Sequence, residues 1–350
     1  MSQYTAKILF IGLGSIGQRH LRNLRQICGD KVEILAYRSL GRDIRISENL
    51  TAESGVDLGR AYGVEIFTDY AKALEQNPCA VFITNPTGLH VETALEAAKH
   101  DCHLFIEKPL SDSLEGLEEL VKLVKERNLT TLVGYQLRFH PSLKLVHRLI
   151  EECRIGQVLS VHSEFGEYLP DTHPYEDYRK GYAARSDLGG GALFSLSHEL
   201  DYLYWLFGMP QRLFALGGKL SQLEMDADDT ASILMECTVD GKSIPVHAHL
   251  DFVQRPPSRK CYIVGEEGKI SCDYSSNRVD LYTAGKKQWE SFQFTDFQRN
   301  DMFLAEIKHF IACLEGKEKP VTDINEGLKS LRIALAAKRS LESGTVVEDI

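Results

Sequence analysis

The opening residues of the chain constrain its fold more than any other segment. A short apolar run over residues 7–11 breaks into Gly12-Leu13-Gly14-Ser15-Ile16-Gly17, and a helical pattern of apolar residues follows. This order predicts a buried strand, a glycine turn and a helix, the context in which G-x-G-x-x-G binds a pyrophosphate. The glycines permit a tight turn and a close backbone approach, and the helix N-terminus favours an anion. The residues expected to contact a dinucleotide here are Gly12, Gly14, Ser15, Ile16 and Gly17.

Strand and helix patterns then alternate through the first part of the chain. Apolar runs that suit buried strands recur, with amphipathic helical patterns between them. These runs are residues 32–37, 64–67, 80–83, 103–106 and 131–135. Residues 40–62 are polar and are expected to be irregular. The alternation predicts a doubly wound parallel sheet, which binds ligands at the carboxyl ends of its strands.

Period-two patterns dominate after about residue 130. From Ile244 to Phe252, for example, apolar and polar residues alternate. Further strands are expected at 159–165, 230–239, 260–264, 269–273, 279–283 and 288–294, and helices at 143–152, 299–315 and 324–343. The 350 residues can form two cores. We therefore predict an α/β fold with a dinucleotide-binding Rossmann domain over residues 1–130. An α+β domain with a large, mostly antiparallel sheet follows over residues 131–350, for substrate binding and oligomerisation.

The overall charge and the cysteine pattern exclude several classes of protein. A net charge of −10 argues against nucleic acid and anionic membrane surfaces as partners. No apolar run approaches the roughly 20 residues that cross a bilayer, and the first apolar stretch is too short for a signal peptide. None of the eight cysteines forms a C-x-x-C pair, so neither a zinc site nor a disulfide framework is expected. We expect a cytoplasmic protein without a metal, and the large sheet suggests a homodimer or homotetramer.

The end of the second strand bears on the choice of cofactor. NAD sites usually carry Asp or Glu there, whereas this chain has Tyr37-Arg38-Ser39, with Arg42 close behind. A guanidinium binds a 2′-phosphate in a fork and a hydroxyl adds a donor, which favours NADP through Arg38 and Ser39. NAD is the alternative cofactor, and a solvated basic loop is the alternative interpretation of these residues.

Two residues are candidates for proton transfer. Lys108 lies between Glu107 and Pro109 at a strand end, and burial or nearby charge there can adjust the basicity of an amine. His198 follows the glycines 189–191 in a helical stretch that continues to residue 207, with acidic neighbours beside it. The alternatives are a surface lysine and a core histidine satisfied by a carboxylate.

Other groupings are less suited to chemistry. His247, His249 and Asp251 share one strand face, but a polar sheet face explains them more simply than a metal. Ser195 lacks the G-x-S-x-G context of a hydrolase nucleophile. His198 and its acidic neighbours Glu199 and Asp201 do not share one helix face, so they do not suggest zinc.

Together these motifs resemble the Gfo/Idh/MocA family, the glucose–fructose oxidoreductase and inositol dehydrogenase superfamily, over nearly the whole chain. The matching motifs, in order, are the glycine turn, Asn85-Pro86-Thr87 with His90, Glu107-Lys108-Pro109, Gly134-Tyr135-Gln136 with Arg138-Phe139-His140-Pro141, and the glycines 189–191 through His198 to Asp201. The resemblance implies that Lys108 and His198 are catalytic. It implies cofactor contacts from Asn85, Pro86, Thr87, His90, Glu107, Lys108 and Gln136. Substrate contacts are expected from Lys108, Tyr135, Arg138, His140, Arg179, Tyr182 and His198.

One position departs from the family pattern. Many members carry an aspartate four residues before the histidine, where this chain has Phe194. The variant resembles members associated with surface-sugar and nonulosonic-acid pathways. The resemblance therefore implies an oxidoreductase that acts on a hydroxyl or ketone of a sugar, sugar acid or nucleotide-sugar. The alternatives are retained-cofactor chemistry on a sugar (dehydratase, epimerase or glycosidase type) and a non-catalytic NADP-sensing regulator.

Overall fold

The chain forms two compact units in the computed structural model, which describes residues 6–39, 43–47 and 49–350. Met1–Gly134 and Phe303–Leu328 make the first unit, and Tyr135–Met302 and Lys329–Ile350 make the second. The sequence predicts one boundary, after residue 130, whereas here the chain returns to the first unit before it ends in the second.

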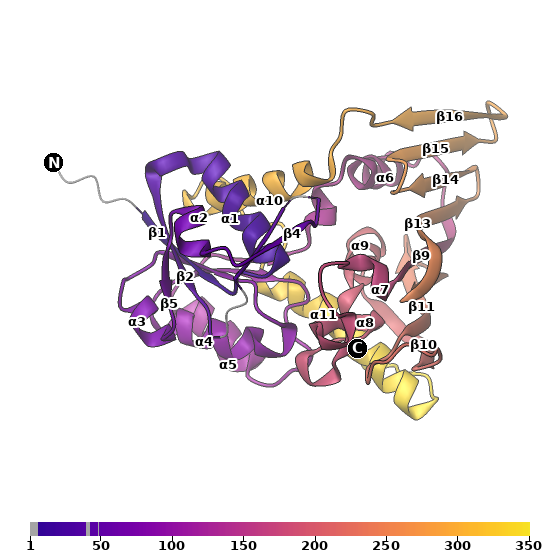
Figure 1. The fold of residues 1–350 in the computed structure, drawn as a ribbon. Coiled ribbons are helices and arrows are strands. Elements are labelled where there is room, and N and C mark those ends of the chain that lie inside the picture. The colour runs from indigo at the N-terminus through magenta and orange to yellow at the C-terminus, as the bar shows by residue number, and fades with distance from the viewer. Residues whose placement is uncertain (1–5, 40–42, 48) are drawn as a thin grey trace. The chain divides into compact units, whose positions relative to one another are not determined.

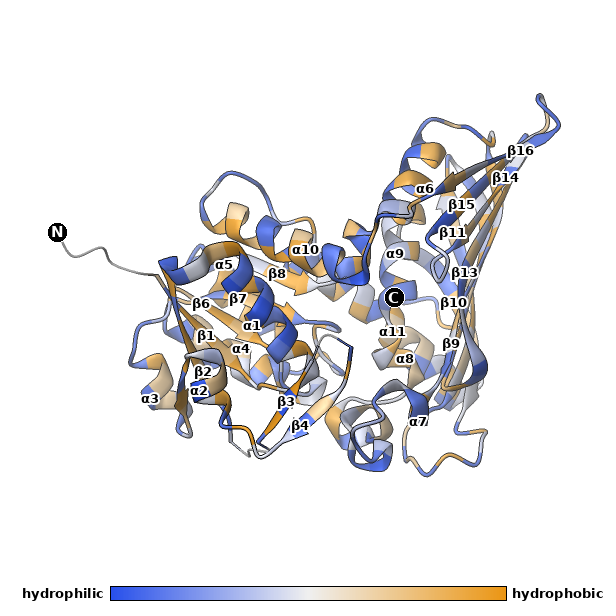
Figure 2. Cartoon of the chain, turned by 45° about the horizontal axis from the view of Figure 1, so that its top comes forward, coloured by the Kyte–Doolittle hydropathy of each residue, from blue (hydrophilic) through white to orange (hydrophobic). Residues whose placement is uncertain are grey.

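A six-stranded parallel sheet organises the first unit (Figure 1). Its strands, in spatial order, are β5 (Glu65–Phe67), β2 (Val32–Tyr37), β1 (Ala6–Ile11), β6 (Ala80–Ile83), β7 (His103–Glu107) and β8 (Thr131–Gly134). The central strands are continuous apolar runs, which Figure 2 shows as orange arrows, because helices cover both faces of such a sheet. The order reverses at β1, which pairs with both β2 and β6. Doubly wound sheets bind their ligands at this switch point.

Helices and aromatic side chains complete the core of this unit. The helices are α1 (Ser15–Cys28), α2 (Leu58–Tyr62), α3 (Tyr70–Leu74), α4 (His90–Lys99), α5 (Leu117–Glu126) and most of α10 (Arg299–Leu314), with 3₁₀ turns η1 (Gly29–Lys31) and η2 (Thr87–Leu89). Phe82 stacks on Phe10 and Phe105, with ring centroids 4.7 and 4.6 Å apart. Phe310 of α10 meets Phe82 and Phe105 edge-on at 5.6 Å, so the returning segment contributes to this core.

The second unit is built on an eight-stranded sheet. Its strands, in spatial order, are β10 (Pro210–Gly218), β11 (Thr230–Val239), β12 (Lys242–Asp251), β9 (Val158–Tyr168), β13 (Val253–Gly265), β14 (Gly268–Asp273), β15 (Arg278–Thr283) and β16 (Gln288–Gln293). Only β9 and β12 pair in parallel; the other neighbours are antiparallel. The helical elements of this unit are α6 (Pro141–Glu151), α7 (Leu169–Thr172), α8 (Ala192–Ser195), α9 (His198–Phe207) and most of α11 (Ile324–Ser343), with turns η3 (Gln136–Phe139), η4 (Tyr178–Lys180), η5 (Tyr182–Ala184) and η6 (Ser186–Leu188).

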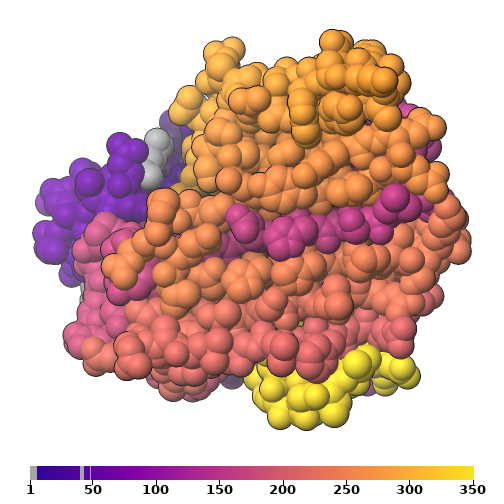
Figure 3. Space-filling model, turned by 90° about the vertical axis from the view of Figure 1, so that its right-hand side faces the viewer, coloured from indigo at the N-terminus to yellow at the C-terminus, as the bar shows by residue number. Residues whose placement is uncertain are grey.

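Alternation along the strands gives this sheet two different faces. In β12, Val246 and Ala248 are buried while His247 and His249 alternate with them on the other face. Helix α9 packs on the apolar side, against β9, β11 and β12. In the part of the chain that the structure describes, no helix covers the opposite face, which Figure 3 shows with β9 as a magenta band. Leu234 and Trp289 are more than half exposed there.

The predicted fold class is confirmed, with three local errors. The strands predicted at 32–37, 80–83 and 230–239 coincide with β2, β6 and β11. The interval 40–62 is not irregular throughout, because it contains a hairpin of β3 (Ile44–Ile46) and β4 (Ala52–Ser54) as well as α2. Gln18 of α1 bonds the hairpin at the Ile44 carbonyl and the Ile46 N–H, a tertiary contact without a local signal. Strand β10 was also missed, and the helix predicted after the glycines breaks between α8 and α9.

None of the helices within the described ranges is long and apolar enough to cross a membrane.

Candidate active site

The glycine turn after β1 has a distinct geometry at each glycine. Gly12 has φ +88°, and a Cβ there would lie 3.2 Å from the Thr84 carbonyl oxygen. A Cβ on Gly17 would lie 2.3 Å from the Gly12 carbonyl oxygen, so α1 packs on the turn only with glycine at this position. A Cβ on Gly14 would meet nothing within 4 Å. The turn is therefore tight at two glycines and open at the third.

This open turn fits the diphosphate of a dinucleotide. The first N–H that bonds back to the turn belongs to Gln18, which donates to the Gly14 carbonyl at 2.9 Å. The preceding N–H groups of Ser15 and Ile16 thus stand at the helix start, where no acidic residue lies in the first turn. In the next strand-end loop, Asn85 Oδ1 is buried without a hydrogen-bond partner among the described residues. An unsatisfied acceptor beside an open anion cradle suits a polar ligand.

The end of β2 carries the residues expected to select the cofactor. The Arg38 side chain is only 11% exposed and lies 3.5 Å from Asp43 Oδ1, so it is not a freely solvated arginine. Ser39 follows it and is exposed, and Tyr37 stacks on Tyr70 at 5.2 Å. Arg42 lies outside the described residues.

The loop after β6 is held to the loop after β7 by His90. His90 is fully buried, with Nδ1 2.9 Å from the Pro109 carbonyl oxygen and Nε2 2.9 Å from the Asn85 carbonyl oxygen. Burial lowers the pKa of His90, while hydrogen bonding to the two carbonyl oxygens opposes that shift. Pro86 caps η2, which begins with the buried Thr87. His90 therefore supports two loops that were predicted to contact the cofactor.

Glu107 and Lys108 lie at the end of β7. The Glu107 side chain is almost buried, and its Oε2 accepts from the Lys108 N–H at 3.2 Å. Its Oε1 lies 2.5 Å from His20 Nε2. Lys108 itself is half-buried. The sequence alone gives His20 no role, since nothing local links it to a residue 87 positions later.

His198 is the first residue of α9 and is 6% exposed. The Tyr135 ring meets its imidazole edge-on, with centroids 5.8 Å apart. Gln136 Oε1 is buried without a hydrogen-bond partner among the described residues. The Tyr135 phenol lies beside the hydroxyls of Ser197 and Ser330. Burial raises the pKa of the Tyr135 phenol, which stays protonated and able to donate. The second unit thus places the Tyr135 ring against His198, with Ser197 directly before the histidine in the chain.

Two buried ion pairs hold the first turn of α9. Arg138 forks onto Asp201 at 2.9 and 2.8 Å, and Ser330 Oγ donates to the same carboxylate at 2.8 Å. Arg259 of β13 forks onto Glu199 at 2.7 and 2.9 Å. The Arg138 guanidinium, predicted to contact substrate, is thus engaged in supporting α9.

His140 has a structural position as well. Its Nδ1 accepts from the Ser142 N–H at 3.2 Å and so caps α6. Burial, with a smaller contribution from the Arg259 charge, lowers the pKa of His140 to about 4. The imidazole is therefore neutral at pH 7, as a cap acceptor must be.

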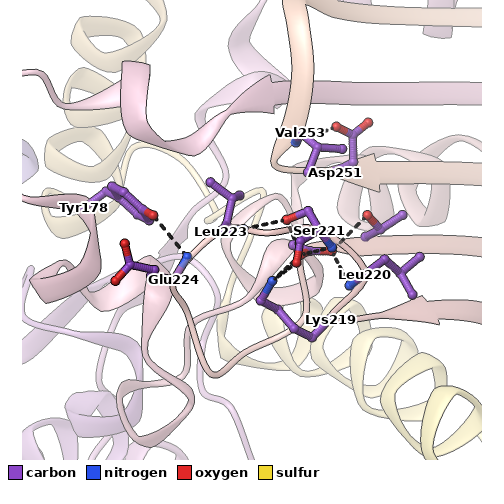
Figure 4. A network of polar contacts seen from close by, with 10 residues as sticks. Tyr178, Lys219, Leu220, Ser221, Leu223, Glu224, Asp251 and Val253 are labelled. Atoms are coloured by element: carbon purple, nitrogen blue, oxygen red, sulfur yellow. Dashed lines mark hydrogen bonds and ion pairs between the residues drawn. The ribbon is translucent and has the colours of Figure 1, made fainter.

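The segment that contains Arg179 and Tyr182 is braced by the loop between β10 and β11, and Figure 4 shows the contact of Tyr178 in this segment with Glu224 in the loop. Arg179 is half exposed and forks onto Asp177, and it also reaches Glu224 at 3.3 Å. The Glu224 N–H donates to Tyr178 Oη at 3.1 Å. Tyr182 is half-buried in η5 of the same segment.

The base of this loop is fixed by two adjacent aspartates, the half-buried Asp228 and the buried Asp229. Asp229 accepts from the N–H groups of Leu220 and Ser221, both at 2.9 Å. Asp228 accepts from the Leu193 N–H at 2.9 Å, and a Cβ on Gly191 would lie 2.2 Å from Asp228 Oδ1. The loop thereby fixes the glycine turn that leads into α8.

The position that departs from the family pattern holds a buried aromatic ring. Phe194 is buried in α8, with Lys338 Nζ 5.6 Å from its ring centroid.

On the outer face of the large sheet, His247 Nδ1 lies 2.7 Å from His162 Nδ1, and His247 Nε2 lies 2.8 Å from Ser232 Oγ. Among the residues described, no three His, Cys, Asp or Glu side chains come together as metal ligands.

Two models of known protein families match the chain, one in each unit. Residues 6–135 match the family model described as oxidoreductase family, NAD-binding Rossmann fold, and residues 143–271 match the GFO/IDH/MocA C-terminal domain. The chain is 25% identical over 349 residues to myo-inositol 2-dehydrogenase of Thermotoga maritima, covering 96% of each protein. It is 27% identical over 270 residues to 2,7-anhydro-N-acetylneuraminate hydratase of Mediterraneibacter gnavus, covering 76% of this chain and 70% of the relative.

A solved structure shares the fold along the whole chain. It is the WlbA dehydrogenase of Bordetella pertussis in complex with NADH and UDP-GlcNAcA, with a TM-score of 0.79. The two proteins are 23% identical, and the match covers 98% of each chain.

Proposed function

Because the chain belongs to the Gfo/Idh/MocA family of NAD-binding oxidoreductases, we propose that it is an NAD(P)-dependent dehydrogenase or reductase for a hydroxyl or ketone group of a sugar-like substrate. The observation that carries the proposal is the open glycine turn at Gly14, which follows β1, together with Lys108, which directly follows β7 of the same sheet. The substrate class is drawn from the relatives, among them an inositol dehydrogenase. A sugar, a sugar acid and a nucleotide-sugar all carry the required carbinol.

Each unit contributes part of the chemistry. When bound, the nicotinamide supplies or accepts the hydride. The Lys108 amine exchanges the hydroxyl proton at Nζ or polarises the carbonyl oxygen, and His198 is its partner or the main acid–base group. Glu107 bonds the Lys108 backbone, and two ion pairs hold the helix that begins with His198. These contacts favour the assignment, because a general acid–base group must be held in one position.

The other site residues take binding or supporting roles. Gly12, Gly14, Ser15, Ile16 and Gly17 hold the diphosphate, with Asn85, Pro86 and Thr87 beside it and Gln136 as a further cofactor contact. Tyr135, Arg179 and Tyr182 bind substrate hydroxyls or a carboxylate. Arg138, His140, His90 and Glu107 keep these groups in place.

NADP is the proposed preferred cofactor, with NAD second. The guanidinium of Arg38 and the hydroxyl of Ser39 suit a 2′-phosphate, and neither repels it. Asp43 lies close to Arg38, so a 2′-phosphate competes with this carboxylate for the guanidinium.

We also propose that the protein is a homodimer or homotetramer, in which the uncovered face of the large sheet in Figure 3 packs against a second copy of the chain.

The proposal is tested by a screen of sugars, sugar acids and nucleotide-sugars against NADP(H) and NAD(H) side by side. The expected result is substrate-dependent oxidation or reduction of the nicotinamide, followed at 340 nm, with the larger kcat/KM for the phosphorylated cofactor. Binding of both cofactors with no turnover on any substrate contradicts the dehydrogenase assignment and favours a sensing role.

A second function has a specific observation in its favour, the similarity to a hydratase over 270 residues. In this alternative the cofactor stays bound and the sugar undergoes elimination, hydration or epimerisation without net redox change. Copurification of a nicotinamide, together with product formation at constant absorbance, supports the alternative over the dehydrogenase.

A further inference from the structure

A buried histidine on the glycine-turn helix contacts the carboxylate that precedes Lys108. His20 follows Gly17 by three residues in α1 and is fully buried. Its Nε2 lies 2.5 Å from Glu107 Oε1, which joins α1 to the last residue of β7. A hydrogen bond of this length to a buried carboxylate is stronger than an ordinary neutral one.

The second oxygen of Glu107 continues the connection to Lys108. Oε2 accepts from the Lys108 N–H at 3.2 Å, so the carboxylate bridges the imidazole and the lysine backbone. Gly134 closes the other side, because a Cβ there would lie 3.2 Å from Glu107 Oε1. The Glu107 side chain is therefore confined in one orientation by its neighbours.

The surroundings of His20 fix which nitrogen donates. Its ring centroid lies 4.9 Å from that of Phe105, 5.9 Å from Phe303 and 6.1 Å from Phe82. Nδ1 is buried and has no hydrogen-bond partner in the described part of the chain. We assign the proton to Nε2, which donates to Glu107, because a proton on Nδ1 would have no acceptor in this aromatic cage.

We propose that His20 is a positioning residue for Lys108, acting through Glu107. The same helix presents its N-terminal N–H groups to the diphosphate, so His20 couples the cofactor end of α1 to the backbone of Lys108. This inference rests on the proposed function, in which Lys108 exchanges the substrate proton. His20 lies outside the G-x-G-x-x-G motif, and the inference gives it the role of holding the Lys108 backbone.

The test compares three substitutions of buried residues in the full-length protein. His20→Leu removes the donor, His20→Gln restores an N–H near the position of Nε2, and Phe310→Leu loosens the same aromatic cluster without touching Glu107. The readouts are hydrogen exchange at the Lys108 amide, dinucleotide affinity by titration, and kcat. His20→Asn, whose amide is too short to reach Glu107, replaces His20→Leu if that variant does not fold.

The expected result is specific to the donor. In His20→Leu the Lys108 amide exchanges about 10-fold faster and kcat falls about 10-fold, while dinucleotide affinity changes less than about threefold. His20→Gln recovers most of both losses, and Phe310→Leu lowers thermal stability without either change. The inference is overturned if His20→Leu keeps the wild-type Lys108 amide exchange rate and kcat. It is also overturned if Phe310→Leu changes both quantities as much as His20→Leu does. If wild-type protein binds neither NADPH nor NADH, the proposed function fails, and the exchange measurement still decides whether His20 holds Lys108.

Discussion

The two units hold their candidate site residues by different means. In the first unit the anion cradle is made by backbone: a glycine turn, a helix start and an open space at Gly14. In the second unit the surroundings of His198 are made by side chains, and the ion pairs Arg138–Asp201 and Arg259–Glu199 fix its helix. The glycine turn therefore depends on residues that are close together in the sequence, whereas the position of His198 depends on side chains that are far apart in the sequence. Perturbing each unit should therefore have different consequences.

The largest expected effect is on stability, in the second unit. Arg138→Met leaves Asp201 buried without its cation, which should cost about 3–5 kcal/mol in the free energy of unfolding. Urea titration measures it. In the double variant Arg138→Met/Asp201→Leu the cost should be clearly smaller than for Arg138→Met, because no charge remains buried. Equal costs for the single and double variants would show that the ion pair does not support α9.

The next effect is on catalysis, in the first unit. Lys108→Ala should lower kcat about 100-fold or more, because proton exchange loses its amine. Thermal stability and dinucleotide affinity should stay near wild type, since Lys108 is half-buried at a strand end. Lys99→Ala on α4, an exposed lysine of the same unit, is the matched control. Turnover that survives Lys108→Ala contradicts the assigned role.

A smaller effect concerns pH, again in the second unit. His140 has a folded pKa near 4, below its ordinary value near 6.5, so the unfolded chain binds more protons between these pH values. The stability contributed by neutral His140 is present above pH 6.5 and declines as pH falls toward 4, by about 3 kcal/mol. His140→Asn keeps a capping side chain without this titration, so its unfolding free energy should depend less on pH over that range. Parallel pH profiles for the two proteins would refute the assignment.

The smallest effect is on affinity, at the cradle itself. Gly14 has a backbone conformation open to alanine, with φ −72° and free space at the Cβ position. Gly14→Ala should therefore fold normally but weaken dinucleotide binding about 10-fold, because the methyl group occupies the space for the diphosphate. Gly17→Ala should instead lower the melting temperature, since its Cβ meets the Gly12 carbonyl. Unchanged affinity in Gly14→Ala would show that the diphosphate does not approach there.

The same contrast explains how much the sequence could predict. The Rossmann order, the glycine turn and most strand positions follow from local rules, since G-x-G-x-x-G and continuous apolar runs carry their own signal. The β3–β4 hairpin was missed because Gln18 holds it from another element. The break before α9 was missed because its apolar pattern continues through Leu196.

The side-chain partners of the site were beyond local rules. The sequence identified Lys108 and His198 as candidates, and these roles stay predictions. It did not reveal that Glu107 bonds His20, nor that Arg138 is engaged by Asp201. Both contacts join residues more than 60 positions apart, and a single sequence holds no signal for such pairs. His140 was likewise predicted to contact substrate, and only its position directly before α6 in the structure identifies it as a helix cap.

The central claim is that the turn between β1 and α1 holds the diphosphate of a nicotinamide dinucleotide. Titration of the wild-type protein with NADPH and with NADH, followed by calorimetry, tests it most directly. The account predicts one saturable site per chain, tighter for NADPH, and weakened in Gly14→Ala. No binding of either cofactor, or binding that Gly14→Ala leaves unchanged, would contradict it.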